Sequence, residues 1–181
     1  MKKELDEKLC KDFPNLYTDR RNDMMATCMC WGFECGDGWF ELIYDLSSKL
    51  EPLITNIIKK DRKWYKRLYR YISKRLYWLK NHKLFPGEIV RKMGSMSWKD
   101  YNKISQRYYP RASQVKEKYG TLRFYMSSET QEMSNLISVA EDLSAVTCET
   151  CGKPGKERGR GWYYTACDEH TRKEDLDEWD E

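Results

Sequence analysis

The stretch from Cys148 to His170 carries four side chains at the spacing of a tetrahedral metal site. Cys148 and Cys151 form one pair, Cys167 and His170 form the other, and two residues separate the members of each pair. Three thiolates and one imidazole at this spacing are typical of zinc. A Cys-x-x-Cys turn lets two sulfurs converge on one ion, while backbone N–H groups of the turn offset the thiolate charge. The sequence therefore predicts a zinc site in the C-terminal part of the chain.

The residues around the four ligands predict a small finger of the treble-clef type. Gly152 and Pro154 fit a tight knuckle, and residues 162–165 fit the return strand of a hairpin. The second ligand pair opens a polar segment with acidic residues at its start, as at the start of a helix. Four protein ligands leave no position for an activated water, so we expect a structural zinc. A Cys148–Cys151 disulfide or inert thiols are the alternatives.

The composition indicates the compartment in which this chain acts. The chain has 181 residues, of which seven are cysteines and 34% are charged. The first residues lack the apolar stretch of a secretory signal. No run approaches the roughly 18 apolar residues of a membrane span. We therefore expect a cytoplasmic protein without a membrane span, in which cysteines more often bind metal than form disulfides.

Positive charge is concentrated in residues 59–92, which hold 13 Lys and Arg residues against two acidic residues. This segment therefore carries +11, and the rest of the chain carries −7, because the whole chain carries +4. Charge that is separated in this way favours an anionic partner.

Residues 59–82 have the pattern of an amphipathic helix whose cations stand four residues apart, with tyrosines and tryptophans between them. Like charges at that spacing oppose an isolated helix, so an anion along the column would explain them. Aromatic rings beside the cations offer stacking surfaces. A solvated face or a membrane surface is the alternative. The predicted contacts to nucleic acid or another polyanion are Arg62, Lys66, Arg67, Arg70 and Lys74.

Three further segments predict an α+β fold, with a small antiparallel sheet packed by helices and the finger at the C-terminus. Alternation over 113–126 predicts a strand or hairpin, with a turn or a bulge at Tyr119–Thr121. Helical spacing predicts helices over 39–58 and 130–146, the second with Leu143 and Val146 facing inward. The expected organisation is an N-terminal segment (1–27), a core (28–146) with a basic helical elaboration at 59–92, and the finger with an acidic tail (147–181).

The N-terminal half offers two weaker candidate sites. Cys28, Cys30, Cys35 and Cys10 can be interpreted as a second metal site, but no Cys-x-x-Cys pair is present and buried free cysteine is common. Acidic residues near the same turn are the only candidates for a metal-dependent nuclease, and solvated acids are their simpler interpretation. They are Glu34, Asp37 and Glu41.

Three stretches of the chain together resemble small proteins encoded by bacteriophages and prophages. These are CWGFECGDGWFELI (30–43), VKEKYGTLRFYM (115–126) and the ligand stretch (148–170). In that group a Gly-rich aromatic turn, a strand of this type and a C-terminal zinc finger occur in the same order. The resemblance implies action in the cytoplasm of an infected bacterial cell. It implies no substrate and no catalytic residue, and it does not include the basic helix.

These observations favour a non-enzymatic phage zinc-binding protein that binds nucleic acid or another polyanion through the basic helix. The alternative is an anti-defence factor that uses the same surface to bind a host defence protein or to sequester a nucleotide signal. An enzyme is the least supported class, because His82 is the one histidine outside the ligand set and no P-loop or open metal position is present.

Overall fold

The structure, a computed structural model, describes the chain except residues 23, 26, 62–70, 72–74, 76–108 and 176–181. It divides into two compact units, one formed by Met1–Thr55 with Pro110–Glu181 and the other by Asn56–Tyr109. Most of the second unit lies outside the described residues, so the fold that follows is that of the first. None of the described helices is long and apolar enough to cross a membrane.

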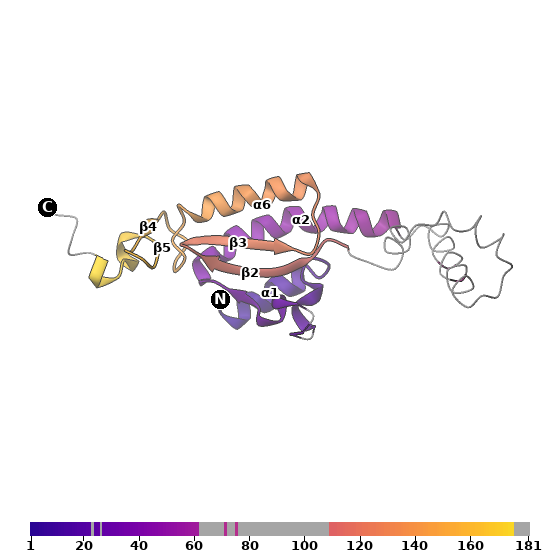
Figure 1. The fold of residues 1–181 in the computed structure, drawn as a ribbon, viewed down its shortest axis with the longest axis horizontal. Helices are drawn as coiled ribbons and strands as arrows, with labels where there is room; N and C mark the ends of the chain where they lie inside the picture. Colours follow the sequence, from indigo (N-terminus) through magenta and orange to yellow (C-terminus); the bar gives the residue numbers. More distant parts are fainter. Residues whose placement is uncertain (23, 26, 62–70, 72–74, 76–108, 176–181) are drawn as a thin grey trace, which may run out of the picture. The chain divides into compact units, whose positions relative to one another are not determined.

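A β-hairpin forms the centre of the first unit (Figure 1). β2 (Ala112–Lys118) pairs antiparallel with β3 (Thr121–Met126), with Lys118 opposite Thr121. The two residues between the strands, Tyr119 and Gly120, both have positive φ, 54° and 76°. This is the turn type whose twist matches that of a hairpin. The predicted strand segment is therefore a hairpin with a turn, and the bulge lies elsewhere, between Ala112 and Gln114.

A third strand enlarges the sheet in a way that the sequence did not indicate. β1 (Phe33–Glu34) pairs with β2 in parallel, with Phe33 opposite Val115. The strand order is β1-β2-β3, and a second sheet of two strands lies in the finger. The predicted α+β class is confirmed, and its larger sheet is mixed because a two-residue strand joins it from a distant part of the sequence.

Helix α6 (Gln131–Ser144) lies along the free edge of β3. The outward N–H groups of β3 donate to its side chains, Leu122 N to Ser144 Oγ at 2.8 Å and Phe124 N to Glu141 Oε1 at 2.9 Å. These bonds satisfy backbone donors that would otherwise form an open edge. Buried Ser144 continues the stripe of Met133, Ile137 and Ala140.

The prediction that Leu143 and Val146 face inward is wrong, because their side chains are 49% and 57% exposed. Ser144, and not Leu143, faces the sheet here, and its hydroxyl accepts a hydrogen bond from Leu122 N at the edge of β3. The N–H groups of β3 need hydrogen-bond acceptors, and the last turns of α6 therefore direct Glu141 and Ser144 toward the strand.

Two more helices complete the core of this unit. α1 (Lys3–Asp12) is followed by a segment that buries Leu16 and Tyr17, and the predicted helix over 39–58 is α2 (Phe40–Asp61). α2 continues through Pro52 and buries a stripe of aliphatic side chains at helical spacing, Ile43, Leu46, Leu50 and Ile54. Burial of each such side chain stabilises the folded state by roughly 1.5–3 kcal/mol.

Candidate metal centre

The four predicted ligands converge at the C-terminal end of the first unit. Their ligand atoms all lie within 4.8 Å of one another, and no other group of three or more metal-ligating side chains occurs in the described part of the chain. Cys151 Sγ lies 3.7 Å from Cys167 Sγ, and Cys167 Sγ lies 3.2 Å from His170 Nδ1. Zinc–sulfur bonds of about 2.3 Å in a tetrahedron place two sulfurs about 3.8 Å apart. The arrangement is compatible with one metal ion and four protein ligands.

A short hairpin and two turns hold the ligands in place. β4 (Lys156–Arg158) pairs antiparallel with β5 (Tyr164–Ala166), as the hairpin prediction expects. The knuckle closes through bonds from Cys148 N to Lys153 O and from Gly152 N to Cys148 O, both 2.8 Å. The second ligand pair lies on the 3-10 turn η4 (Asp168–His170) and the residue that precedes it. The predicted helix is therefore a 3-10 turn, followed by another, η5 (Lys173–Asp175).

Backbone N–H groups affect the pKa of the buried Cys148 thiol. Burial alone would raise its pKa, but the N–H groups of Cys167, Cys151 and Thr150 outweigh this and lower the pKa to about 6. The same donors stabilise a thiolate whether or not it binds an ion. Cys148 is thus prepared as an anionic ligand near neutral pH.

The glycine-rich turn of residues 35–38 packs directly on this knuckle. Gly38 N donates to Glu149 O at 2.8 Å, and Gly36 N donates to Glu149 Oε1 at 2.7 Å. Trp39, which is fully buried, donates from Nε1 to Thr147 O at 2.8 Å. A Cβ on Gly38 would lie 2.4 Å from Cys148 O. Only glycine therefore permits this contact between the start of α2 and the ligand turn.

The tip of the β2–β3 hairpin forms a second contact with the finger. Thr165, 2% exposed, donates from Oγ1 to Gly120 O at 2.6 Å, and its carbonyl oxygen accepts from Glu149 N at 3.0 Å. The three stretches that carry the resemblance thus meet at one place. Sequence reasoning placed each stretch separately and missed Glu149, Gly38 and Thr165 as the residues that join them. Glycines adjacent to aromatic residues were the available signal.

The other predicted sites do not form clusters that can hold a metal within the described residues. Cys35 is buried, and burial raises its pKa to about 12. Burial and the neighbouring Asp6 raise the pKa of Cys10 to about 12 as well. Among the three acids, Glu34 accepts from Gln114 and Asp37 forms an ion pair with Lys2. The buried cysteines and the bonded acids therefore agree with the simpler interpretation of these residues as structural or solvated side chains.

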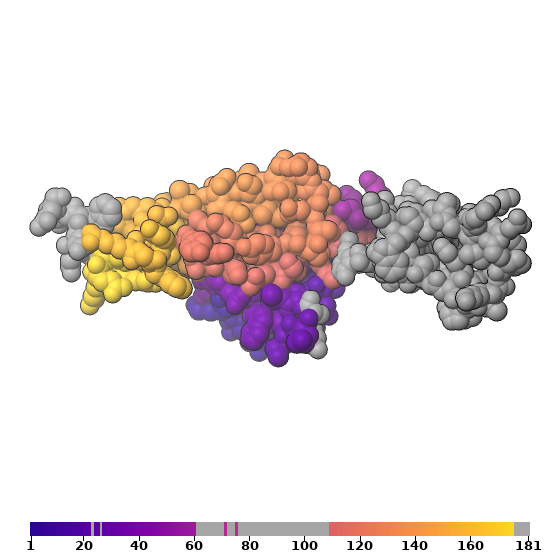
Figure 2. All heavy atoms as spheres, in the orientation of Figure 1, coloured from indigo at the N-terminus to yellow at the C-terminus, as the bar shows by residue number. Residues whose placement is uncertain are grey.

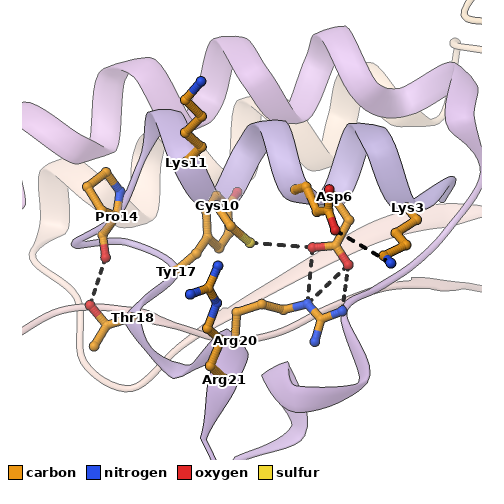
Figure 3. A pocket seen from close by; sticks show the side chains of 10 residues that line it. Lys3, Asp6, Cys10, Lys11, Pro14, Tyr17, Thr18, Arg20 and Arg21 are labelled. Atoms are coloured by element: carbon orange, nitrogen blue, oxygen red, sulfur yellow. Dashed lines mark hydrogen bonds and ion pairs between the residues drawn. The ribbon is translucent and has the colours of Figure 1, made fainter.

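A cavity of about 510 Å³ lies between α1 and the segment that follows it (Figure 3). Arg20 extends across it to Asp6, with two bonds of 3.0 Å from Nε and one of 2.7 Å from Nη2. Arg20 Nη1 also donates to Cys30 O at 2.7 Å, and the Cys10 thiol donates to Asp6 at 3.4 Å. A Cβ on Gly32 would lie 2.8 Å from this carboxylate. The ion pair therefore ties α1 to the Cys28–Trp31 turn.

Replacing Arg20 with Met should lower the free energy of unfolding by about 2 kcal/mol, because the carboxylate of Asp6 loses three hydrogen bonds from a cation whose side chain is 30% exposed. Adding Asp6→Asn should restore part of this loss, since the remaining side chain is uncharged. Chemical denaturation measures both. Equal stability of the Arg20→Met variant and the unmodified protein would show that the pair contributes nothing.

The five predicted anion-binding residues, Arg62, Lys66, Arg67, Arg70 and Lys74, lie outside the described residues. Beyond the end of α2 at Asp61, the described residues of this segment are Tyr71 and Arg75, which are both exposed and helical. The Arg75 guanidinium lies over the Tyr71 ring at 6.0 Å from its centroid. Arg75 is one of the 13 basic residues of the segment, and Tyr71, which the helical pattern assigned to its apolar stripe, is 61% exposed.

Comparison with protein-family models, with curated proteins and with solved structures gives no match for this chain.

Proposed function

We propose that the chain is a zinc-binding protein and that its zinc is structural. The convergence of Cys148, Cys151, Cys167 and His170 carries this proposal. Three thiolates and one imidazole in a tetrahedron suit zinc better than the harder oxygen-binding cations. Four protein ligands close the coordination shell, so the ion stabilises the finger and leaves no position for a reacting water.

Metal analysis of the purified chain tests this proposal. We expect one zinc per chain, and a loss of that zinc when Cys151 is replaced with Ser. Iron or no metal in the unmodified protein would contradict the assignment, as would full zinc content in the variant.

We further propose that the segment 59–92 binds nucleic acid through its cations. The 13 basic residues of this segment, against two acidic residues, support this, together with the exposed Tyr71–Arg75 pair. Contacts of Lys and Arg to phosphates give affinity without sequence preference, and they make that affinity depend steeply on salt.

Charge reversal within the segment should weaken this binding at least about 10-fold at roughly 0.15 M salt. The variant is Lys66→Glu, Arg70→Glu and Lys74→Glu, measured by fluorescence anisotropy with labelled duplex DNA across a salt series. The slope of log K against log salt should become shallower by about 0.9 for each phosphate that the variant no longer neutralises.

A matched control changes the same net charge on the first unit, at three exposed lysines of α1 and α2: Lys3→Glu, Lys11→Glu and Lys49→Glu. We expect less than a threefold effect. Equal weakening by both triple variants would assign the binding to net charge and remove the segment as its site.

The resemblance to phage proteins extends the proposal to an infected bacterial cell. If duplex and single strands both fail to bind at low salt, an anti-defence role becomes the better candidate. Its test is a pull-down from host lysate together with thermal shifts in the presence of nucleotides, since a ligand that binds the folded state raises its melting temperature.

A further inference from the structure

The outer face of the β2–β3 hairpin carries cations and aromatic rings. Along both strands these residues alternate with residues that face the core. Val115, Leu122 and Phe124 are buried. The residues between them pair across the strands, Gln114 with Tyr125, Lys116 with Arg123 and Lys118 with Thr121. The space-filling view shows this hairpin open at the front of the molecule, beside the finger (Figure 2).

Two of these cations lie next to exposed rings. Lys116 Nζ is 5.9 Å from the centroid of Tyr125, and Lys118 Nζ is 5.3 Å from that of Tyr119. Lys116 and Arg123 lie directly opposite each other, and like charges in that position oppose strand pairing. Two acids border this face: Glu141 of α6 lies 3.9 Å from Arg123, and Glu34 of β1 is the register partner of Lys116 on the other side of β2. Lys118, beside the turn, has no acidic register partner, because it lies opposite Thr121.

Tyr119 is the one described non-glycine residue with positive φ, at 54°. Its side chain is 69% exposed, so core packing does not require a tyrosine there. Turns of this type favour Asn or Gly at that position. A strained residue that packing does not explain directs attention to a binding role.

The finger contacts the turn of the hairpin and carries exposed aromatic residues of its own. A Cβ on Gly120 would lie 3.2 Å from Tyr164 Cα, so the hairpin tip touches β5. The residues just before Tyr164 are exposed rings, Trp162 at 71% and Tyr163 at 43%. Exposed aromatic residues therefore occur both at the hairpin turn and in the finger that contacts it.

We propose that this hairpin face, defined by Lys116, Lys118, Tyr119, Arg123 and Tyr125, binds single-stranded nucleic acid. Unpaired bases stack on exposed aromatic rings, and the intervening cations contact the phosphates. Sheets with exposed aromatic side chains recognise single strands in this way. The inference goes beyond the proposed function, because it stands on residues of the first unit and does not need the basic segment.

The test uses the full chain carrying Lys66→Glu, Arg70→Glu and Lys74→Glu, so that failure of the basic segment does not affect the result. The probes are labelled oligothymidylate and oligouridylate of about 12 nucleotides, read by anisotropy at roughly 0.3 M salt. Tyr119→Asn in this chain should weaken single-strand binding at least fivefold without lowering the melting temperature. Tyr125→Ser should weaken it similarly. The two probes distinguish DNA from RNA as the preferred strand.

Val139→Asn, which changes an exposed apolar residue on α6, is the control and should leave the affinity unchanged. Duplex DNA of the same length should be insensitive to both tyrosine variants, since its bases are already stacked. The proposal is overturned if the charge-reversed chain binds neither single strand, or if both tyrosine variants bind as tightly as their parent. Equal weakening on duplex and single strands would also overturn it.

Discussion

Replacing Cys167 with Ser is expected to abolish metal binding, unfold residues 147–175 and lower the stability of the whole first unit. Structural zinc contributes its binding energy directly to folding. The ligand turn also accepts bonds from Gly38 and Trp39, so its unfolding exposes the buried Trp39. We expect the free energy of unfolding to fall by more than about 4 kcal/mol. Denaturation followed by tryptophan fluorescence, with metal analysis, measures it.

Cys28→Ser is the matched control, because Cys28 is an exposed thiol outside the ligand set. It should retain zinc and unfold at the same denaturant concentration as the unmodified protein. A strong chelator should reproduce the Cys167→Ser result in the unmodified protein. If chelation removes zinc without changing the unfolding transition, the ion is not structural.

Replacing Gly38 with Ala should lower the free energy of unfolding by about 3 kcal/mol and loosen the finger. The added methyl would lie 2.4 Å from Cys148 O, 2.4 Å from Gly152 N and 2.5 Å from Cys151 N. All three are backbone atoms of the ligand turn, so none can rotate away. Hydrogen exchange should show faster opening at the ligand turn, and zinc should leave the variant faster than the unmodified protein.

Gly161→Ala is the control that separates the steric clash of an added methyl group from the cost of a positive φ. Gly161 has φ of 91°, but a Cβ there would meet nothing within 4 Å. We expect a cost of about 1 kcal/mol, from the positive φ alone. If both alanine variants are equally stable, the packing of the glycine-rich turn on the ligand turn does not contribute to the fold.

Local patterns allowed much of the fold to be predicted from the sequence. The ligand spacing from Cys148 to His170 placed four side chains that do converge. Alternation and helical spacing located the hairpin, α2 and α6, because each pattern depends on neighbours a few residues away.

Long-range contacts could not be predicted. Phe33–Glu34 has too few residues to show alternation, so β1 and its parallel pairing with Val115 emerge only in the structure. Leu143 fitted the apolar stripe of α6, but Ser144 faces the sheet because Leu122 N needs an acceptor. Asp6 and Arg20 stand 14 residues apart in polar sequence, which gives no sign that they form an ion pair in the fold.

The contacts between the glycine-rich turn and the ligand turn set an order for folding during synthesis. Trp39 bonds to a carbonyl 108 positions later, and Gly36 to a carboxylate 113 positions later. Ribosomes add about 5–20 residues per second, so Trp39 waits roughly 5–20 s for its partner. The four candidate ligands are present together only after His170 has been synthesised. A chain cut short before Cys167 lacks two of the four candidate ligands, so the four-ligand site cannot form in it.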